Sequence, residues 1–185
     1  MKKGAIFLDR DGTLNPDPGY ISSPADFELY DSTLLALAML MKTDLPLIMV
    51  TNQSGIGRGI IEQAALAQIH EKLDQNLSTV DVFLTGKYYC PHVPEDHCGC
   101  RKPKSDLFLQ AKKDHDLDLS ASYLIGDSLC DVNAAEAIDV YSILVRTGNG
   151  IETEAKLNQD GVTVDYIGDS LLDCANHLLA LEVSA

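Results

Sequence analysis

Short, continuously apolar runs alternate along the chain with longer runs of helical spacing. The short runs predict strands at 4–9, 46–51, 80–86, 121–126 and 140–145, and near 163–167. The longer runs predict helices at 32–43, 62–78, 105–115, 129–138 and about 169–181, with a weak helix in the tail. Because strands and helices alternate, we expect an α/β protein with three layers, a mainly parallel central sheet covered by helices on both faces. The length suits a single domain spanning 1–185.

Polar residues follow three of the predicted strands at the point where each strand ends. The segments are 9–13, 51–55, and 126–128 with Asp131. Any one of them alone is the usual composition of a turn or a helix cap. In a parallel sheet, however, all three would meet at the carboxyl edge, where ligands of such sheets bind. We therefore expect them to share one pocket.

The residue types in these segments are suited to phosphoryl transfer. Hard oxygen ligands at Asp9 and Asp127 would hold Mg²⁺ together with a substrate phosphate. A carboxylate can attack phosphorus to give a covalent intermediate, and a second one two residues later, at Asp11, can serve as acid and then base. The Thr51 hydroxyl and nearby backbone N–H groups can hold phosphate oxygens.

The charge balance narrows the choice of partner. The formal net charge is −14, which disfavours nucleic acids and anionic membranes because their phosphates need lysine and arginine. No apolar run approaches the roughly 20 residues that span a bilayer, and the first residues do not form a signal peptide. We expect a cytoplasmic monomer that binds a small anionic substrate through a local concentration of basic side chains.

The predicted loop at about 88–104 carries a second kind of site. Cys90, His92, Cys98 and Cys100 offer three thiolates and an imidazole, a complete tetrahedral set for Zn²⁺. His97 competes with His92 as the fourth ligand, but neighbouring side chains such as those of 97 and 98 tend to point apart. Free buried cysteines and a disulfide are the alternatives; a proline-rich loop has little core to bury thiols, and a reducing compartment disfavours disulfides. We expect a closed, structural zinc site that directs the following residues, Arg101 and Lys102, toward the pocket.

Taken together, the motifs resemble those of the haloacid dehalogenase (HAD) superfamily. They are Asp9-Arg10-Asp11-Gly12-Thr13, Thr51-Asn52, Lys102, and Gly126-Asp127 with Asp131, in that order. The resemblance implies a Rossmann-like phosphatase in which Asp9 is the nucleophile and Asp11 the acid and base. It also implies that Thr51 and Lys102 bind the phosphate.

The same resemblance implies the magnesium ligands. They would be the carboxylates of Asp9 and Asp127 and the backbone carbonyl of Asp11, with Asp131 in support. The motifs lie too close together along the chain for a large cap domain, so the core itself must shape the substrate site.

The zinc loop with Cys-Arg-Lys-Pro at 100–103 resembles one branch of the superfamily, the heptose-bisphosphate and histidinol-phosphate phosphatases. Segments 15–20 and 52–59 are more similar to the heptose enzymes, which implies removal of the 7-phosphate from a heptose 1,7-bisphosphate in lipopolysaccharide precursor synthesis. The implied substrate-binding residues are Asp17, Gly19, Tyr20, Asn52, Gln53, Ser54, Arg58 and Arg101. Histidinol phosphate is the alternative substrate, and a catalytically silent, zinc-stabilised binding protein is the alternative from another class.

Overall fold

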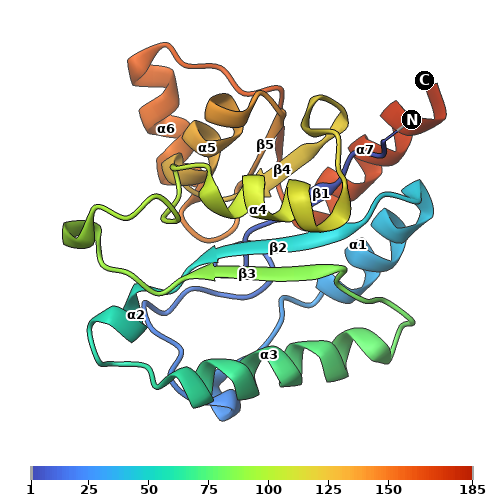
Figure 1. Ribbon diagram of the computed structural model, residues 1–185. Helices are drawn as coiled ribbons and strands as arrows, with labels where there is room; N and C mark the ends of the chain where they lie inside the picture. Colours follow the sequence, from blue (N-terminus) through green and yellow to red (C-terminus); the bar gives the residue numbers. More distant parts are fainter. Residues whose placement is uncertain (1, 185) are drawn as a thin grey trace.

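The computed structural model describes residues 2–184, and its six strands form one wholly parallel sheet between two layers of helices (Figure 1). The strands are β1 (Ile6–Leu8), β2 (Leu47–Asn52), β3 (Gly86–Cys90), β4 (Tyr123–Gly126), β5 (Tyr141–Val145) and β6 (Tyr166–Gly168). Their order across the sheet is β3-β2-β1-β4-β5-β6. Strands β2 and β3 are added on one side of β1, and β4, β5 and β6 on the other, so the strand order switches between β1 and β4. In folds of this kind, ligands bind at the carboxyl ends of the strands beside such a switch.

The helices of the described residues cover both faces. They are α1 (Thr33–Leu40), α2 (Ser54–Gly57), α3 (Gln63–Ser78), α4 (Asp106–His115), α5 (Leu129–Ile138), α6 (Gly150–Asp160) and α7 (Leu171–Ser184). Short 3-10 turns lie at Pro24–Asp26, Met41–Thr43, Pro94–Asp96 and Leu119–Ala121. Within residues 2–184, no helix combines the length and the apolar character needed to cross a bilayer.

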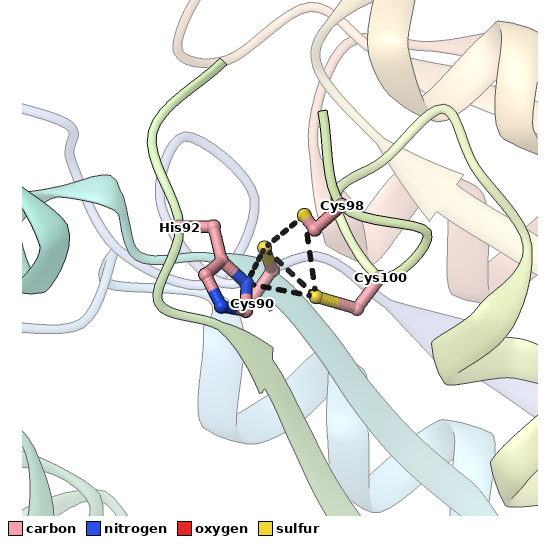
Figure 2. Close-up of side chains that lie close together, drawn as sticks. All are labelled: Cys90, His92, Cys98 and Cys100. Atoms are coloured by element: carbon pink, nitrogen blue, oxygen red, sulfur yellow. Dashed lines mark hydrogen bonds between the residues drawn. The ribbon is translucent and has the colours of Figure 1, made fainter. Parts of the chain in front are cut away.

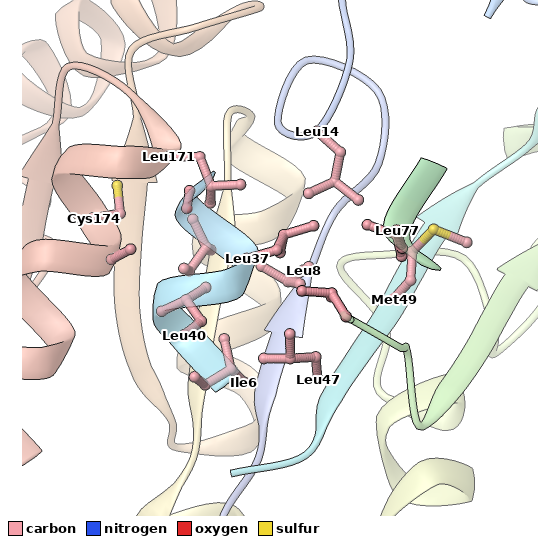
Figure 3. Packing of buried hydrophobic residues seen from close by; sticks show 14 of the residues in the cluster. Ile6, Leu8, Leu14, Leu37, Leu40, Leu47, Met49, Leu77, Leu171 and Cys174 are labelled. Carbon is pink, nitrogen blue, oxygen red and sulfur yellow. The ribbon is translucent and has the colours of Figure 1, made fainter. Parts of the chain in front are cut away.

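Alternation along the central strand assigns the two cores. Ile6 and Leu8 face one side, where α1, α3 and α7 pack, as Figure 3 shows. Phe7 faces the other side and meets Phe108 of α4 edge-on, with ring centroids 5.2 Å apart. Both faces of β1 are fully buried, which explains why a central parallel strand appears in the sequence as a continuous apolar run. The predicted three-layer α/β fold is confirmed.

One predicted strand is wrong. The apolar residues of 80–86 do not form a strand; they lie in the connection after α3, and the strand runs instead from Gly86 to Cys90. Val82 is buried and its backbone N–H donates to the carbonyl of Leu77 in α3, whereas Phe83 is exposed. The true strand is half-buried at the sheet edge, so its apolar signal is weaker than that of the connection before it. The loop predicted from 88 therefore begins at 91.

Candidate active site

The carboxyl ends of β1, β2 and β4 border one cavity of about 310 Å³. Every residue predicted to act in catalysis, magnesium binding or substrate binding lines it, except Arg58. These lining residues are Asp9, Asp11, Asp17, Gly19, Tyr20, Thr51, Asn52, Gln53, Ser54, Arg101, Lys102 and Asp127. Arg58 follows α2 and is exposed to solvent outside this lining.

A buried lysine lies between two carboxylates at the floor of the cavity. Lys102 Nζ is 2.8 Å from Asp9 Oδ1 and 2.7 Å from Asp131 Oδ1, and it donates to the Val50 carbonyl at 2.7 Å. Burial opposes its charge, but Asp131 and Asp9 outweigh burial and raise the pKa of Lys102, so it stays protonated. Burial raises the pKa of Asp9 to about 8 despite the nearby ammonium, and the neighbouring carboxylates act in the same direction.

The backbone of Lys102 is fixed by an asparagine that was predicted to bind substrate. Asn52 Oδ1 accepts from the Lys102 N–H at 3.0 Å, and Asn52 Nδ2 donates to the Lys102 carbonyl at 3.1 Å. This paired contact joins the end of β2 to the loop that carries Lys102. In this structure, the side-chain amide of Asn52 therefore hydrogen-bonds to the backbone of Lys102 and positions that residue.

Asp127 accepts hydrogen bonds from the loop after β5, which the sequence analysis did not assign to the site. Asn149, just after β5, donates to Asp127 Oδ2 from its backbone N–H at 2.7 Å and from its side chain at 3.0 Å. Gly12 approaches the same carboxylate so closely that an added Cβ would lie 2.1 Å from Oδ2, and its φ of +85° also favours glycine. These contacts occupy Oδ2 and leave Oδ1 free of them.

The carboxylates suit a hard divalent cation. Oxygen atoms of Asp9, Asp127 and Asp131 lie within 4.8 Å of one another, and all three residues are buried. Both oxygens of Asp131 are engaged, Oδ1 by Lys102 and Oδ2 by the hydroxyl and backbone N–H of Ser128. Asp9 and Asp127 use only Oδ1 and Oδ2, respectively, in the contacts described above, so each has a second oxygen for a cation, and buried carboxylate oxygens are the donors that Mg²⁺ prefers.

Asp11 is held from several sides. Arg10 donates to both of its carboxylate oxygens at 2.7 to 3.0 Å, Asn15 Nδ2 donates to Oδ1 at 2.9 Å, and Gln53 Nε2 donates to Oδ2 at 2.7 Å. The Asp11 side chain remains 19% exposed, while that of Arg10 is 1% exposed. Asp11 is thus the member of this network that can reach a bound substrate.

The predicted zinc ligands converge on one another. Figure 2 shows the side chains of Cys90, His92, Cys98 and Cys100 pointing toward one another, and five of the distances between their ligand atoms are 3.2 to 3.7 Å. Tetrahedral zinc places sulfur and nitrogen ligands roughly 3.5–3.8 Å apart, given bonds of about 2.3 and 2.0 Å. His97 is not part of the group; its carbonyl accepts from Lys104. The donor set and its spacing therefore fit zinc, with His92 as the fourth ligand.

Several lining or supporting residues were missed. Arg10 and Asn15 flank Asp11 within and beside a motif that drew attention only to its acidic residues. Asn149 follows a predicted strand, so the rule applied to the other strand ends would have found it. Cys130 sits on α5 and lines the cavity, and its place between Ser128 and Asp131, in a segment expected at the pocket, was a signal that could have found it.

Comparison with known proteins identifies the family to which the chain belongs. A model of the HAD-hydrolase-like family matches residues 99–174. The D-glycero-β-D-manno-heptose-1,7-bisphosphate 7-phosphatases of Escherichia coli O6:H1 and Haemophilus ducreyi are each 44% identical. They cover 91% and 86% of this chain, and 90% and 92% of their own lengths. A crystal structure of D,D-heptose 1,7-bisphosphate phosphatase from B. bronchiseptica, complexed with magnesium and phosphate, is 34% identical, with a TM-score of 0.89 over 96% of this chain and 99% of that one. The chain therefore belongs to the HAD-like hydrolases, and among them to the family of the heptose-1,7-bisphosphate 7-phosphatases.

Proposed function

We propose that this enzyme removes the 7-phosphate of D-glycero-β-D-manno-heptose 1,7-bisphosphate through an aspartyl-phosphate intermediate on Asp9. The observation that carries the proposal is the convergence of Asp9, Asp11, Thr51, Lys102 and Asp127 on one cavity. The substrate itself rests on the relatives, whose names give this sugar bisphosphate.

The first half-reaction forms the intermediate. An Asp9 oxygen attacks phosphorus, the bond between phosphorus and the sugar oxygen breaks, and Asp11 gives its proton to the departing alkoxide. In the second half-reaction Asp11 takes a proton from water, and the water oxygen attacks the phosphoryl group and releases Asp9. The Thr51 hydroxyl donates to a phosphate oxygen in both halves. The three ammonium hydrogens of Lys102 lie on Asp9, Asp131 and the Val50 carbonyl, and the one on Asp9 can pass to a phosphate oxygen as Asp9 attacks, which adds positive charge where negative charge develops.

The floor of the cavity also offers ligands for Mg²⁺. The carboxylates of Asp9 and Asp127 and the backbone carbonyl of Asp11 would hold it, and when bound it neutralises negative charge shared by the phosphate and the aspartates. In the absence of a cation, burial raises the pKa of Asp9 to about 8 and that of Asp127 to about 6. Both groups must be ionised to act as ligands, so we propose that metal binding releases protons. Zn²⁺ in the cysteine cluster would have a structural role only.

The rest of the sugar would lie between two loops. Asp17, Gly19 and Tyr20 line the cavity on the loop before α1, and Tyr20 is 44% exposed, so its ring and hydroxyl are available to a ligand. Arg101 lines the cavity and reaches the His92 carbonyl with Nη1 at 3.4 Å, which ties it to the zinc loop. A guanidinium held in this way suits a phosphate that does not react. We therefore assign the 1-phosphate to Arg101, with Arg58 able to take part only if its exposed side chain turns inward.

The test is the ratio of kcat/KM for the heptose 1,7-bisphosphate over that for histidinol phosphate. We expect a ratio well above one, because histidinol phosphate lacks the second anion and brings a cationic amine. Arg101→Ala should lower this ratio, and Lys113→Ala, a cation on the exposed side of α4, is the matched control. A ratio below one for the unmodified enzyme would overturn the proposed substrate in favour of histidinol phosphate.

A further inference from the structure

Gln53 occupies a position that its predicted role in substrate binding does not explain. It follows β2 directly and is 3% exposed although it borders the cavity. Its backbone N–H donates to the carbonyl of Cys90 at 2.7 Å, and its carbonyl accepts from Ile56. The residue is therefore fixed between the end of β3 and the start of α2.

The side-chain amide of Gln53 donates both of its hydrogens to proposed catalytic groups. Nε2 is 2.7 Å from Asp11 Oδ2 and 2.9 Å from Thr51 Oγ1. Since an amide nitrogen has two hydrogens, no donor is left for a ligand. The Thr51 hydroxyl accepts from Gln53 and so keeps its own hydrogen for a phosphate oxygen.

Neighbouring charge determines the orientation of this amide. Gln53 Oε1 accepts from Arg10 Nη2 at 3.2 Å, and the opposite orientation would set that oxygen against the Asp11 carboxylate. Arg10 is buried above the Phe27 ring and lies 3.5 Å from His70 Nε2. Burial, with the Arg10 charge second, lowers the pKa of His70 to about 4, so the imidazole is neutral and does not repel Arg10 at neutral pH.

We infer that Gln53 is a positioning residue that holds the acid–base carboxylate of Asp11 and the phosphate-binding hydroxyl of Thr51 at a fixed separation. The inference deepens the proposed function and rests on it for the roles of these two residues. Gln53 acts through them and makes no side-chain hydrogen bond to the sugar. Its loss should therefore slow the chemical step and leave ground-state binding of the substrate nearly intact.

The test compares Gln53→Met, which keeps the length of the side chain and removes its hydrogen bonds, with Gln159→Met on the exposed face of α6. Each variant is assayed on the heptose bisphosphate and on p-nitrophenyl phosphate, whose leaving group needs little protonation. For Gln53→Met we expect a roughly 10- to 100-fold fall in kcat on the sugar, which is part of the roughly 100- to 10,000-fold that general acid catalysis contributes, because the acid is misplaced and not removed. The KM should stay within about threefold of the original, and the fall in kcat on the aryl phosphate should be smaller. Gln159→Met should change none of these values.

Two other outcomes would overturn the inference. A raised KM with unchanged kcat would make Gln53 a substrate ligand. Equal falls in kcat on both substrates, together with a lower melting temperature, would make it a structural residue only. If the unmodified enzyme ignores the heptose bisphosphate but hydrolyses p-nitrophenyl phosphate, the proposed substrate fails separately, and the same comparison is made with glycerol phosphate as the alkyl ester.

Discussion

Replacing Lys102 by methionine tests the electrostatic core of the site. The substitution keeps an unbranched side chain of similar length and removes the ammonium that lies 2.8 Å from Asp9 and 2.7 Å from Asp131. Lys102 is 2% exposed, so water cannot replace the lost charge. Removing one partner of a buried ion pair costs about 3–5 kcal/mol of folding free energy, because the other charge is left uncompensated.

The size of this loss should depend on pH. The pKa of Asp9 is raised in the folded protein, to about 8 against 3.8, so Asp9 favours folding when protonated and opposes it when ionised. At pH 5, without Mg²⁺, Asp9 is neutral with or without the lysine, so the loss comes from Asp131 and the Val50 carbonyl, which lose their donor. Above pH 8, Asp9 is ionised in the unmodified protein but keeps its proton in the variant, and the loss should be larger by about 0.8 kcal/mol at pH 8.5, since each pH unit of this difference is worth about 1.4 kcal/mol.

Urea unfolding followed by far-ultraviolet circular dichroism measures both values, with Lys113→Met on the exposed side of α4 as the control. If Lys102→Met does not fold at pH 8.5, the double variant Lys102→Met/Asp131→Asn, which also removes one negative charge, should recover part of the stability. A loss below about 1 kcal/mol at pH 8.5 is the range of a surface ion pair and would refute the reasoning. Equal losses at the two pH values would refute it as well.

Three further predictions concern the metals. Zinc should copurify at about one ion per chain, as expected for one four-ligand set, and Cys98→Ser should lose it while Cys130→Ser keeps it, by elemental analysis of protein prepared without chelator. Burial raises the pKa of Asp127 to about 6, so Mg²⁺ must displace a proton at pH 5; the rise in melting temperature on adding Mg²⁺ should be larger at pH 7.5 than at pH 5, and equal rises would contradict this. Asn149→Ala should weaken Mg²⁺ binding about 10-fold by calorimetry, the usual effect of losing a contact to a metal ligand, whereas Asn158→Ala on the exposed face of α6 should leave it unchanged.

Much of the fold followed from apolar periodicity, since central parallel strands such as β1 and β2 are buried on both faces. Apolar periodicity gave a wrong strand where burial is incomplete. β3 lies at the sheet edge, and its Gly-Lys-Tyr-Tyr-Cys sequence is less apolar than the connection at 80–85 that precedes it. Only the pairing of Ile48 with Gly86 and its successors, a contact between distant segments, determines where that strand begins.

The candidate site was largely predictable because parallel strands carry their final residues to a common edge. Position along the chain indicates which residues approach the cavity but does not indicate what each side chain contacts. Asn52 and Gln53 line the cavity as expected, yet their amides bind the Lys102 backbone and the Asp11 carboxylate. Arg58 was predicted beside them and lies outside the cavity lining, because α2 ends there and turns the chain toward solvent.

The covalent intermediate on Asp9 is the central claim, and peptide mass spectrometry after an acid quench during turnover tests it most directly. The sample is the enzyme mixed with Mg²⁺ and heptose 1,7-bisphosphate, and Asp9→Asn is carried through the same procedure. We expect the mass of one phosphoryl group on the peptide that contains Asp9, none on that peptide in the variant, and turnover in the variant reduced to near zero. A phosphoryl group on another residue, or full turnover by a folded Asp9→Asn variant, would contradict the account.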